Sequence, residues 1–176
     1  AVLPANDREQ PGVRTMSDKK NIFISHVHED DALLPQLKDL ISKAGMEVRD
    51  GSINSDKPNA ASNEGYIKSE ILAPRIQWAS TVVVLITHDT AQSDWVNWEI
   101  KYAVEQGKNV VGVFAQGATD ADIPDELRKH GDAAVVGWQS DRVVDAINGK
   151  VTAWDDPATG NPRTTPDWVA KRYSCG

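Results

Sequence analysis

The feature that most constrains the fold is a six-residue apolar run, Thr81–Ile86, with the sequence TVVVLI. Apolar and polar residues do not alternate along it, so a strand formed here would have both faces buried. Strands buried on both faces are typical of parallel sheets that are covered by helices on both sides. The run therefore predicts an α/β protein.

The rest of the chain supplies further strands in alternation with helices. Strands are predicted at residues 21–25, 46–49, 81–86, 109–114 and 133–136, and helices at about 30–44, 64–72, 94–106, 124–127 and 141–148. This alternation predicts a flavodoxin-like three-layer fold, with a five-stranded parallel sheet in the order 2-1-3-4-5.

The 176 residues are enough for one domain with a tail at each end. Residues 1–19 carry prolines and scattered charges without periodicity, which predicts a flexible leader before a domain at residues 20–150. Residues 151–176 are rich in Pro, Thr and Asp but contain Trp154 and Trp168. We therefore expect a C-terminal tail that docks in part on the domain.

Charge and cysteine content narrow the functional classes. The net charge of −7 and the pI of about 5.0 argue against broad binding to nucleic acid or to an anionic membrane. The chain has no apolar run long enough to span a bilayer. Its one cysteine, Cys175, excludes an intrachain disulfide, so we expect a cytoplasmic protein.

The helix expected after Thr81–Ile86 carries the residues that suggest a function. Ser93 is a suitable N-cap, and Val96 and Ile100 recur at the spacing of a core-facing stripe. Trp95 and Glu99 are four residues apart, which places them one above the other on a neighbouring stripe. An aromatic face beside a carboxylate suits the binding of a flat cationic ring on a sugar.

Topology predicts which other residues surround that pair. In parallel sheets of this order, ligands bind beyond the carboxyl ends of the strands, between the first and third strands. Ser25 and His26 end the first strand, and a long polar loop at residues 50–63 follows the second. Loops of that length inside a compact domain are usually functional or mobile. One crevice is therefore expected to contain these segments and the Trp95–Glu99 turn.

Such a crevice suits cleavage of the nicotinamide–ribose bond of NAD. That reaction passes through an oxocarbenium-like transition state, which a carboxylate such as Glu99 stabilises. Nicotinamide is already a cationic leaving group, so no general acid, metal or resident cofactor is required. Trp95 would stack on the pyridinium, and Ser25 would hydrogen-bond the ribose. Spacing alone leaves open that Glu99 is solvated and that Trp95 is a core residue.

Two other functional classes fit the sequence less well. The pattern His26-x-His28-x-Asp30-Asp31 resembles the H-x-H-x-D-H signature of metallo-β-lactamase-type hydrolases, although Asp31 replaces the last histidine and the alternation of strands and helices does not suit that fold. A phosphoacceptor receiver domain needs an Asp at the end of the third strand and a Lys at the end of the fifth. Neither is present, and G-x-G-x-x-G and Walker sequences are absent too.

Four motifs, in order between about residues 20 and 150, resemble the TIR-like domain of the Thoeris antiphage system. They are Phe23-Ile24-Ser25-His26, Arg49-Asp50-Gly51-Ser52-Ile53, Tyr66-Ile67-Lys68-Ser69-Glu70-Ile71-Leu72 and Ser93-x-Trp95-Val96-x-Trp98-Glu99-Ile100.

This resemblance implies the 2-1-3-4-5 sheet, a functional loop after the second strand and a catalytic glutamate at Glu99. It further implies that NAD is the substrate and that a cyclic or otherwise modified ADP-ribose signal activates a partner effector. A phage-derived trigger and self-association are also expected. Residues expected to bind the substrate are Phe23, Ser25, His26, Arg49, Asp50 and Trp95. Because other TIR domains are scaffolds without activity, a non-enzymatic interaction module remains the main alternative.

Overall fold

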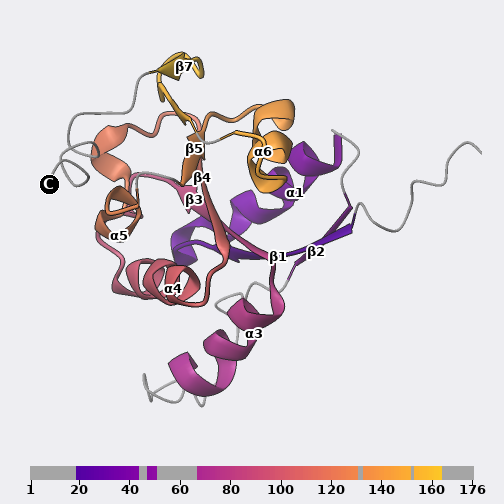
Figure 1. Cartoon of the computed structure of the whole chain (residues 1–176). Coiled ribbons are helices and arrows are strands. Elements are labelled where there is room, and N and C mark those ends of the chain that lie inside the picture. The colour runs from indigo at the N-terminus through magenta and orange to yellow at the C-terminus, as the bar shows by residue number, and fades with distance from the viewer. Residues whose placement is uncertain (1–18, 44–46, 51–66, 131–132, 152, 164–176) are drawn as a thin grey trace, which may run out of the picture.

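A computed structural model describes residues 19–43, 47–50, 67–130, 133–151 and 153–163. Within these ranges, seven strands form one sheet in the order β2-β1-β3-β4-β5-β6-β7 (Figure 1). Neighbouring strands are parallel from β2 through β6, and β7 runs antiparallel to β6. The protein is therefore an α/β protein with a mostly parallel sheet.

The strands are β1 (Lys19–Ser25), β2 (Glu47–Asp50), β3 (Thr81–Ile86), β4 (Asn109–Phe114), β5 (Ala134–Val136), β6 (Trp154–Asp155) and β7 (Pro162–Arg163). The helical elements are η2 (His28–Leu33), α1 (Leu34–Lys43), η4 (Ile67–Leu72), α3 (Ala73–Trp78), α4 (Asp94–Glu105), η5 (Asp120–Asp122), α5 (Asp125–Arg128) and α6 (Ser140–Ile147).

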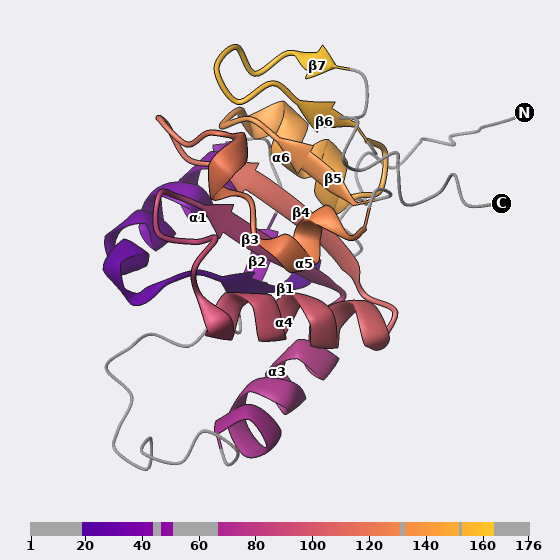
Figure 2. The same cartoon turned by 90° about the vertical axis from the view of Figure 1, so that its left-hand side faces the viewer.

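Helices cover both faces of the sheet and so divide the core in two. Along β3, Val82 and Val84 face the core under α3, α4 and α5, whereas Val83 and Leu85 face the core under α1 and α6. Figure 2 shows α4 lying along one face, with α1 and α6 on the other side of the sheet. All six residues of β3 are buried, as its unbroken apolar sequence predicted.

The prediction of five strands was wrong, because β6 and β7 extend the sheet. Both come from the segment that was expected to be a tail. Trp154 pairs with Val135 of β5, and its side chain is fully buried. Two-residue strands carry no periodic signal, so the sequence pattern could not reveal them.

Two helical segments differ from the expected form. The turn after β1 is a 3-10 helix, η2, and the α-helix begins only at Leu34. Near Pro74 a π-helix, η4, ends at Leu72 and α3 begins at Ala73. Pro74 lies in the first turn of α3, where the helix type changes, and it cannot donate the backbone hydrogen bond that a continuous α-helix would need there.

One glycine allows close packing above β4. A Cβ added to Gly112 would lie 2.9 Å from Leu127 Cδ2 and 3.0 Å from Ile86 Cδ1. A larger residue would therefore push α5 away from the sheet. None of the helices in the described ranges is long and apolar enough to cross a membrane.

Candidate active site

Helix α4 is held in place by its N-cap and by its buried face. The Ser93 hydroxyl accepts a hydrogen bond from the Val96 N–H at 3.1 Å, which confirms the predicted cap. Val96, Ile100 and Ala103 are fully buried against the sheet. Both constraints fix the rotation of α4, and with it the direction in which Glu99 points.

Glu99 contacts the end of β1. The Ser25 hydroxyl donates a hydrogen bond of 2.6 Å to Glu99 Oε1, joining residues that are 74 positions apart. Ser25 is the last residue of β1 and is fully buried, and Glu99 is only 6% exposed. The structure thus brings together two residues expected at the same crevice, and Glu99 is not the solvated helix residue that spacing had left open.

Burial controls the charge of Glu99. Loss of hydration raises the pKa of its carboxyl group to about 8, and the hydrogen bond from Ser25 opposes that rise. At neutral pH, and without a cation beside it, the carboxyl group of Glu99 is therefore mostly protonated. A positive charge placed next to it would favour the ionised form.

Trp95 lies one helical turn before Glu99 and faces outward. Its side chain is 37% exposed, so it is not the core residue that spacing had also allowed. The next tryptophan, Trp98, instead packs against the core and stacks on Tyr102, with the ring centroids 5.2 Å apart and the planes 8° from parallel. Helix α4 thus has a buried carboxylate and an accessible aromatic ring on successive turns.

The other residues expected at the site are placed differently. His26 is half-buried, with Nδ1 3.3 Å from the Ile24 carbonyl oxygen. Phe23 is 1% exposed and packs into the core on the α4 side of the sheet, so its side chain has almost no surface for a ligand. The side chains of Arg49 and Asp50 lie outside the described part of the structure, as does the loop at residues 51–63, although β2 itself is placed.

A polar network that no sequence pattern predicted lies between η2 and the turn after β3. The Thr87 hydroxyl donates a hydrogen bond of 2.5 Å to Asp30 Oδ2. The Thr87 N–H donates to Thr90 Oγ1, whose own hydroxyl donates to the Leu85 carbonyl oxygen. The one available signal was that Asp30 and Thr87 follow the carboxyl ends of β1 and β3.

A second missed pair lies farther along the same edge. His88 Nδ1 is 3.1 Å from Asp122 Oδ2, and that oxygen also accepts a hydrogen bond of 2.8 Å from the Thr119 N–H. Asp122 is thereby fixed by backbone, whereas the His88 side chain is 71% exposed. The pair therefore holds an accessible imidazole in a defined orientation.

The suggested metal site gains no support from the described side chains. Among them, no three His, Cys, Asp or Glu residues are grouped so that they could hold a metal ion. The side chains of His28 and Asp31, which belong to the H-x-H-x-D pattern, lie outside the described set.

Comparison with known proteins identifies one matching family. The family model for the Thoeris protein ThsB, TIR-like domain, matches residues 23–120, a range that includes Ser25, Trp95 and Glu99. No curated protein matches the chain.

Solved structures show only distant similarity. The TIR domain of the Toll-related receptor TRR-2 from Hydra magnipapillata is 12% identical, with 65% of this chain and 82% of that chain covered and a TM-score of 0.45. The CMP N-glycosidase BcmB from Clostridium botulinum is 14% identical, with 75% of this chain and 100% of that chain covered and a TM-score of 0.46.

Proposed function

The chain belongs to the Thoeris ThsB family of TIR-like domains, and from this premise we propose that it is an antiphage enzyme that cleaves NAD. The bond broken is the one between nicotinamide and ribose. The product is a cyclic or otherwise modified ADP-ribose, which serves as a signal for a partner effector. A phage-derived trigger starts the reaction.

The observation that carries this proposal is the buried hydrogen bond between Ser25 and Glu99. A carboxyl group that is 6% exposed loses hydration, and a structural role alone would favour an uncharged side chain there. Charged or titratable groups kept in such surroundings are often functional. The hydrogen bond between Ser25 and Glu99 lies at the carboxyl end of β1, next to β3. Sheets of this order bind ligands near that point.

The chemistry needs one carboxylate and no acid. As the bond between C1′ of the ribose and N1 of the nicotinamide breaks, its electron pair moves to N1 and the nicotinamide leaves as a neutral molecule. The ribosyl carbon becomes cationic, and the ionised Glu99 stabilises it. A nucleophile then bonds to C1′. Water would give free ADP-ribose, and a group within the same molecule would give a cyclic product; in either case the proton lost by the nucleophile passes to the Glu99 carboxylate or to solvent.

The raised pKa of Glu99 fits this cycle. The free enzyme holds the carboxyl group mostly protonated, because its pKa is about 8. The pyridinium of NAD brings a positive charge to the site and favours loss of the proton. In this proposal the substrate therefore generates the ionised carboxylate that the transition state requires.

The remaining residues act in binding. We assign Trp95 to stacking on the nicotinamide ring, because its exposed indole lies one turn from Glu99. Ser25 orients the carboxylate and can hydrogen-bond the ribose, and His26 lies beside it in the chain. Arg49 and Asp50 remain the proposed contacts to ribose and phosphates at the entry to the loop, and Phe23 would support β1 from the core.

The experiment is mass spectrometry of the products formed from NAD, with purified protein and with lysate of phage-infected cells. Wild type is compared with Glu99→Gln and with Glu105→Gln, which replaces an exposed carboxylate on the same helix. We expect an ADP-ribose product from wild type and from Glu105→Gln but not from Glu99→Gln. A chelator should have no effect.

Two results would overturn the proposal. If Glu99→Gln kept full protection against phage while neither purified protein nor lysate consumed NAD, the chain would act as an interaction module. If turnover were lost on chelation and restored by a metal ion, a metallohydrolase that uses His26 and His28 would be the better description.

A further inference from the structure

A cavity lies at the carboxyl ends of β4 and β5, away from Glu99. Its volume is about 310 Å³. The walls come from Gln116 and Gly117 after β4, Trp138 and Gln139 after β5, and residues 157–160 in the turn between β6 and β7. We call it the β4–β5 cavity. Its volume is at the lower end of the range typical of small-molecule sites.

The β4–β5 cavity opens on the same edge of the sheet as the candidate active site. In a parallel sheet all carboxyl ends meet at one edge, and the order β1-β3-β4-β5 puts the ends of β4 and β5 two and three strands from Ser25. At the usual strand spacing this separation is roughly 10–14 Å. Two riboses joined by a pyrophosphate can bridge such a span.

His88 lies between the two sites. It follows β3, the strand next to β1, and a Cβ added to Gly117 of the cavity wall would be 3.9 Å from His88 Nε2. Because Asp122 holds the other ring nitrogen, Nε2 remains directed toward this side of the edge. A polar group therefore stands where the pyrophosphate of a bridging ligand would pass.

We propose that the β4–β5 cavity binds the adenosine half of the dinucleotide whose nicotinamide half lies at Ser25 and Glu99. This inference rests on the proposed NAD cleavage. Trp138 lines the cavity while its side chain also packs against the core under α1 and α6, so the partly exposed remainder of its ring can contact a flat base. The exposed amides of Gln116 and Gln139 can donate and accept hydrogen bonds at the edge of that base.

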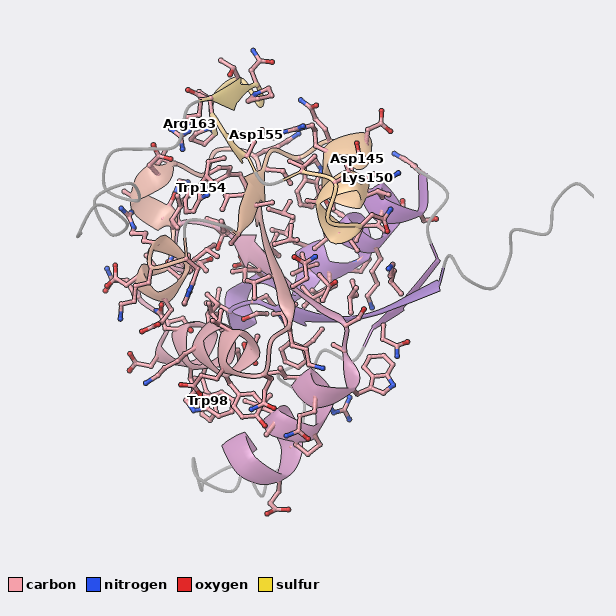
Figure 3. All side chains as sticks on the ribbon, viewed as in Figure 1. Trp98, Asp145, Lys150, Trp154, Asp155 and Arg163 are labelled. Atoms are coloured by element: carbon pink, nitrogen blue, oxygen red, sulfur yellow. The ribbon has the colours of Figure 1, made fainter. Side chains whose placement is uncertain are left out.

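The outer wall of the cavity is formed by the turn between β6 and β7, and β6 is held against β5 by buried polar contacts. Asp155 of β6 is fully buried, accepts a hydrogen bond from the Gly137 N–H at 3.1 Å, and is paired with Arg142 of α6. A Cβ added to Gly137 would lie 3.1 Å from Gly160 Cα, so the backbone of the turn packs closely against the residue that follows β5. Figure 3 shows Asp155 and Arg163 at this end of the sheet. The turn is therefore held against β5 as a fixed wall.

This wall lies outside the family match. The match ends at residue 120, whereas Trp138, Gln139 and the 157–160 turn all follow it. The matched range thus includes Ser25 and Glu99 but only the β4 side of the cavity. We assign to Trp138, Gln139 and the 157–160 turn the selection of a dinucleotide over a mononucleotide.

The test blocks the cavity with one substitution. Ala158→Trp adds bulk from an exposed turn position whose N–H already bonds Asp156, so the fold should tolerate it. Gln106→Trp, exposed at the end of α4, is the matched control. AMP binding is measured by calorimetry on all three proteins, and turnover is compared for NAD and nicotinamide mononucleotide. Thermal melts confirm that each variant is folded.

We expect Ala158→Trp to weaken AMP binding, and to reduce the preference for NAD over the mononucleotide, each by about tenfold or more. Gln106→Trp should match wild type in both. The inference fails if wild type does not bind AMP, or if Ala158→Trp leaves both quantities unchanged while NAD is still cleaved. If AMP binds and Ala158→Trp blocks it but wild type never cleaves NAD, the cavity stands as a nucleotide site and the proposed function fails.

Discussion

At the scale of single residues, one buried carboxyl group determines how this protein should respond to pH. Glu99 is 6% exposed, with the hydroxyl of Ser25 donating to it. Its pKa is raised from 4.5 to about 8, so the folded protein binds its proton more tightly than the unfolded chain does. Folding therefore favours the neutral form of Glu99, whereas the proposed reaction uses its ionised form.

The first prediction concerns stability against pH. Because the folded pKa lies above the unfolded one, the contribution of Glu99 is fully present below about pH 4.5 and is lost as the pH rises to about 8. Glu99→Gln does not titrate there, so its melting temperature relative to wild type should rise by about 10 °C between about pH 5 and about pH 8. A constant difference between the two melting curves would show that Glu99 is not protonated in the fold.

The second prediction concerns Ser25. Its hydrogen bond lowers the pKa of Glu99, so Ser25→Ala should raise that pKa further. The acidic limb of the pH profile for NAD cleavage should then move to higher pH, and the rate at neutral pH should fall by about tenfold. An unchanged acidic limb with a lower rate would mean that Ser25 acts on the ribose alone.

At the scale of elements, α4 decides what the site can do. Its buried stripe of Val96, Ile100 and Ala103 sets the rotation that turns Glu99 inward and leaves Trp95 outside. The two side chains are neighbours on the helix surface by spacing alone, yet only packing assigns one to the interior. The N-cap at Ser93 fixes where this helix begins.

The third prediction tests that cap. Ser93→Ala removes the acceptor for the Val96 N–H and should lower the free energy of unfolding by about 1 kcal/mol. Ser140→Ala is the control, because the cap position of α6 is Gln139 and makes no side-chain cap bond. Urea unfolding of both variants gives the comparison, and an equal loss in both would contradict the role of Ser93.

At the scale of the whole molecule, the sheet extends beyond residue 150 through β6 and β7. Among the residues that the structure describes, Trp154 is the largest fully buried side chain, and it adds to the core under α3, α4 and α5. Arg163 of β7 in turn pairs with Asp120 of η5, with Nη2 and Oδ1 2.6 Å apart. The extension is thereby attached to the loop that follows β4, where the family match ends.

The fourth prediction follows from that attachment. Trp154→Ala should destabilise the protein by about 3–5 kcal/mol, as expected for a large side chain removed from a core. Trp78→Ala, at a position that is 44% exposed, should cost about 1 kcal/mol or less. Denaturant unfolding distinguishes them, and a small loss for Trp154→Ala would mean that β6 contributes little to folding.

Much of this architecture follows from local pattern. The buried strand at Thr81–Ile86, the cap at Ser93 and the strand at Asn109–Phe114 all lie where the sequence placed them. Each depends on neighbours within a few residues, through unbroken apolar character, side-chain capping or helical spacing. Topology selected Ser25, because it brings the carboxyl ends of strands together. Glu99 was selected by its helical spacing from Trp95 and by the family resemblance.

Tertiary structure decided the rest. Sequence could not show that Glu99 is buried, that Phe23 faces the core, or that Trp154 extends the sheet. The burial of a side chain depends on which distant segments pack over it, and two-residue strands have no period of their own. Local sequence thus specifies the helices and strands. The charge of Glu99, in contrast, is set by contacts with residues far away in the sequence.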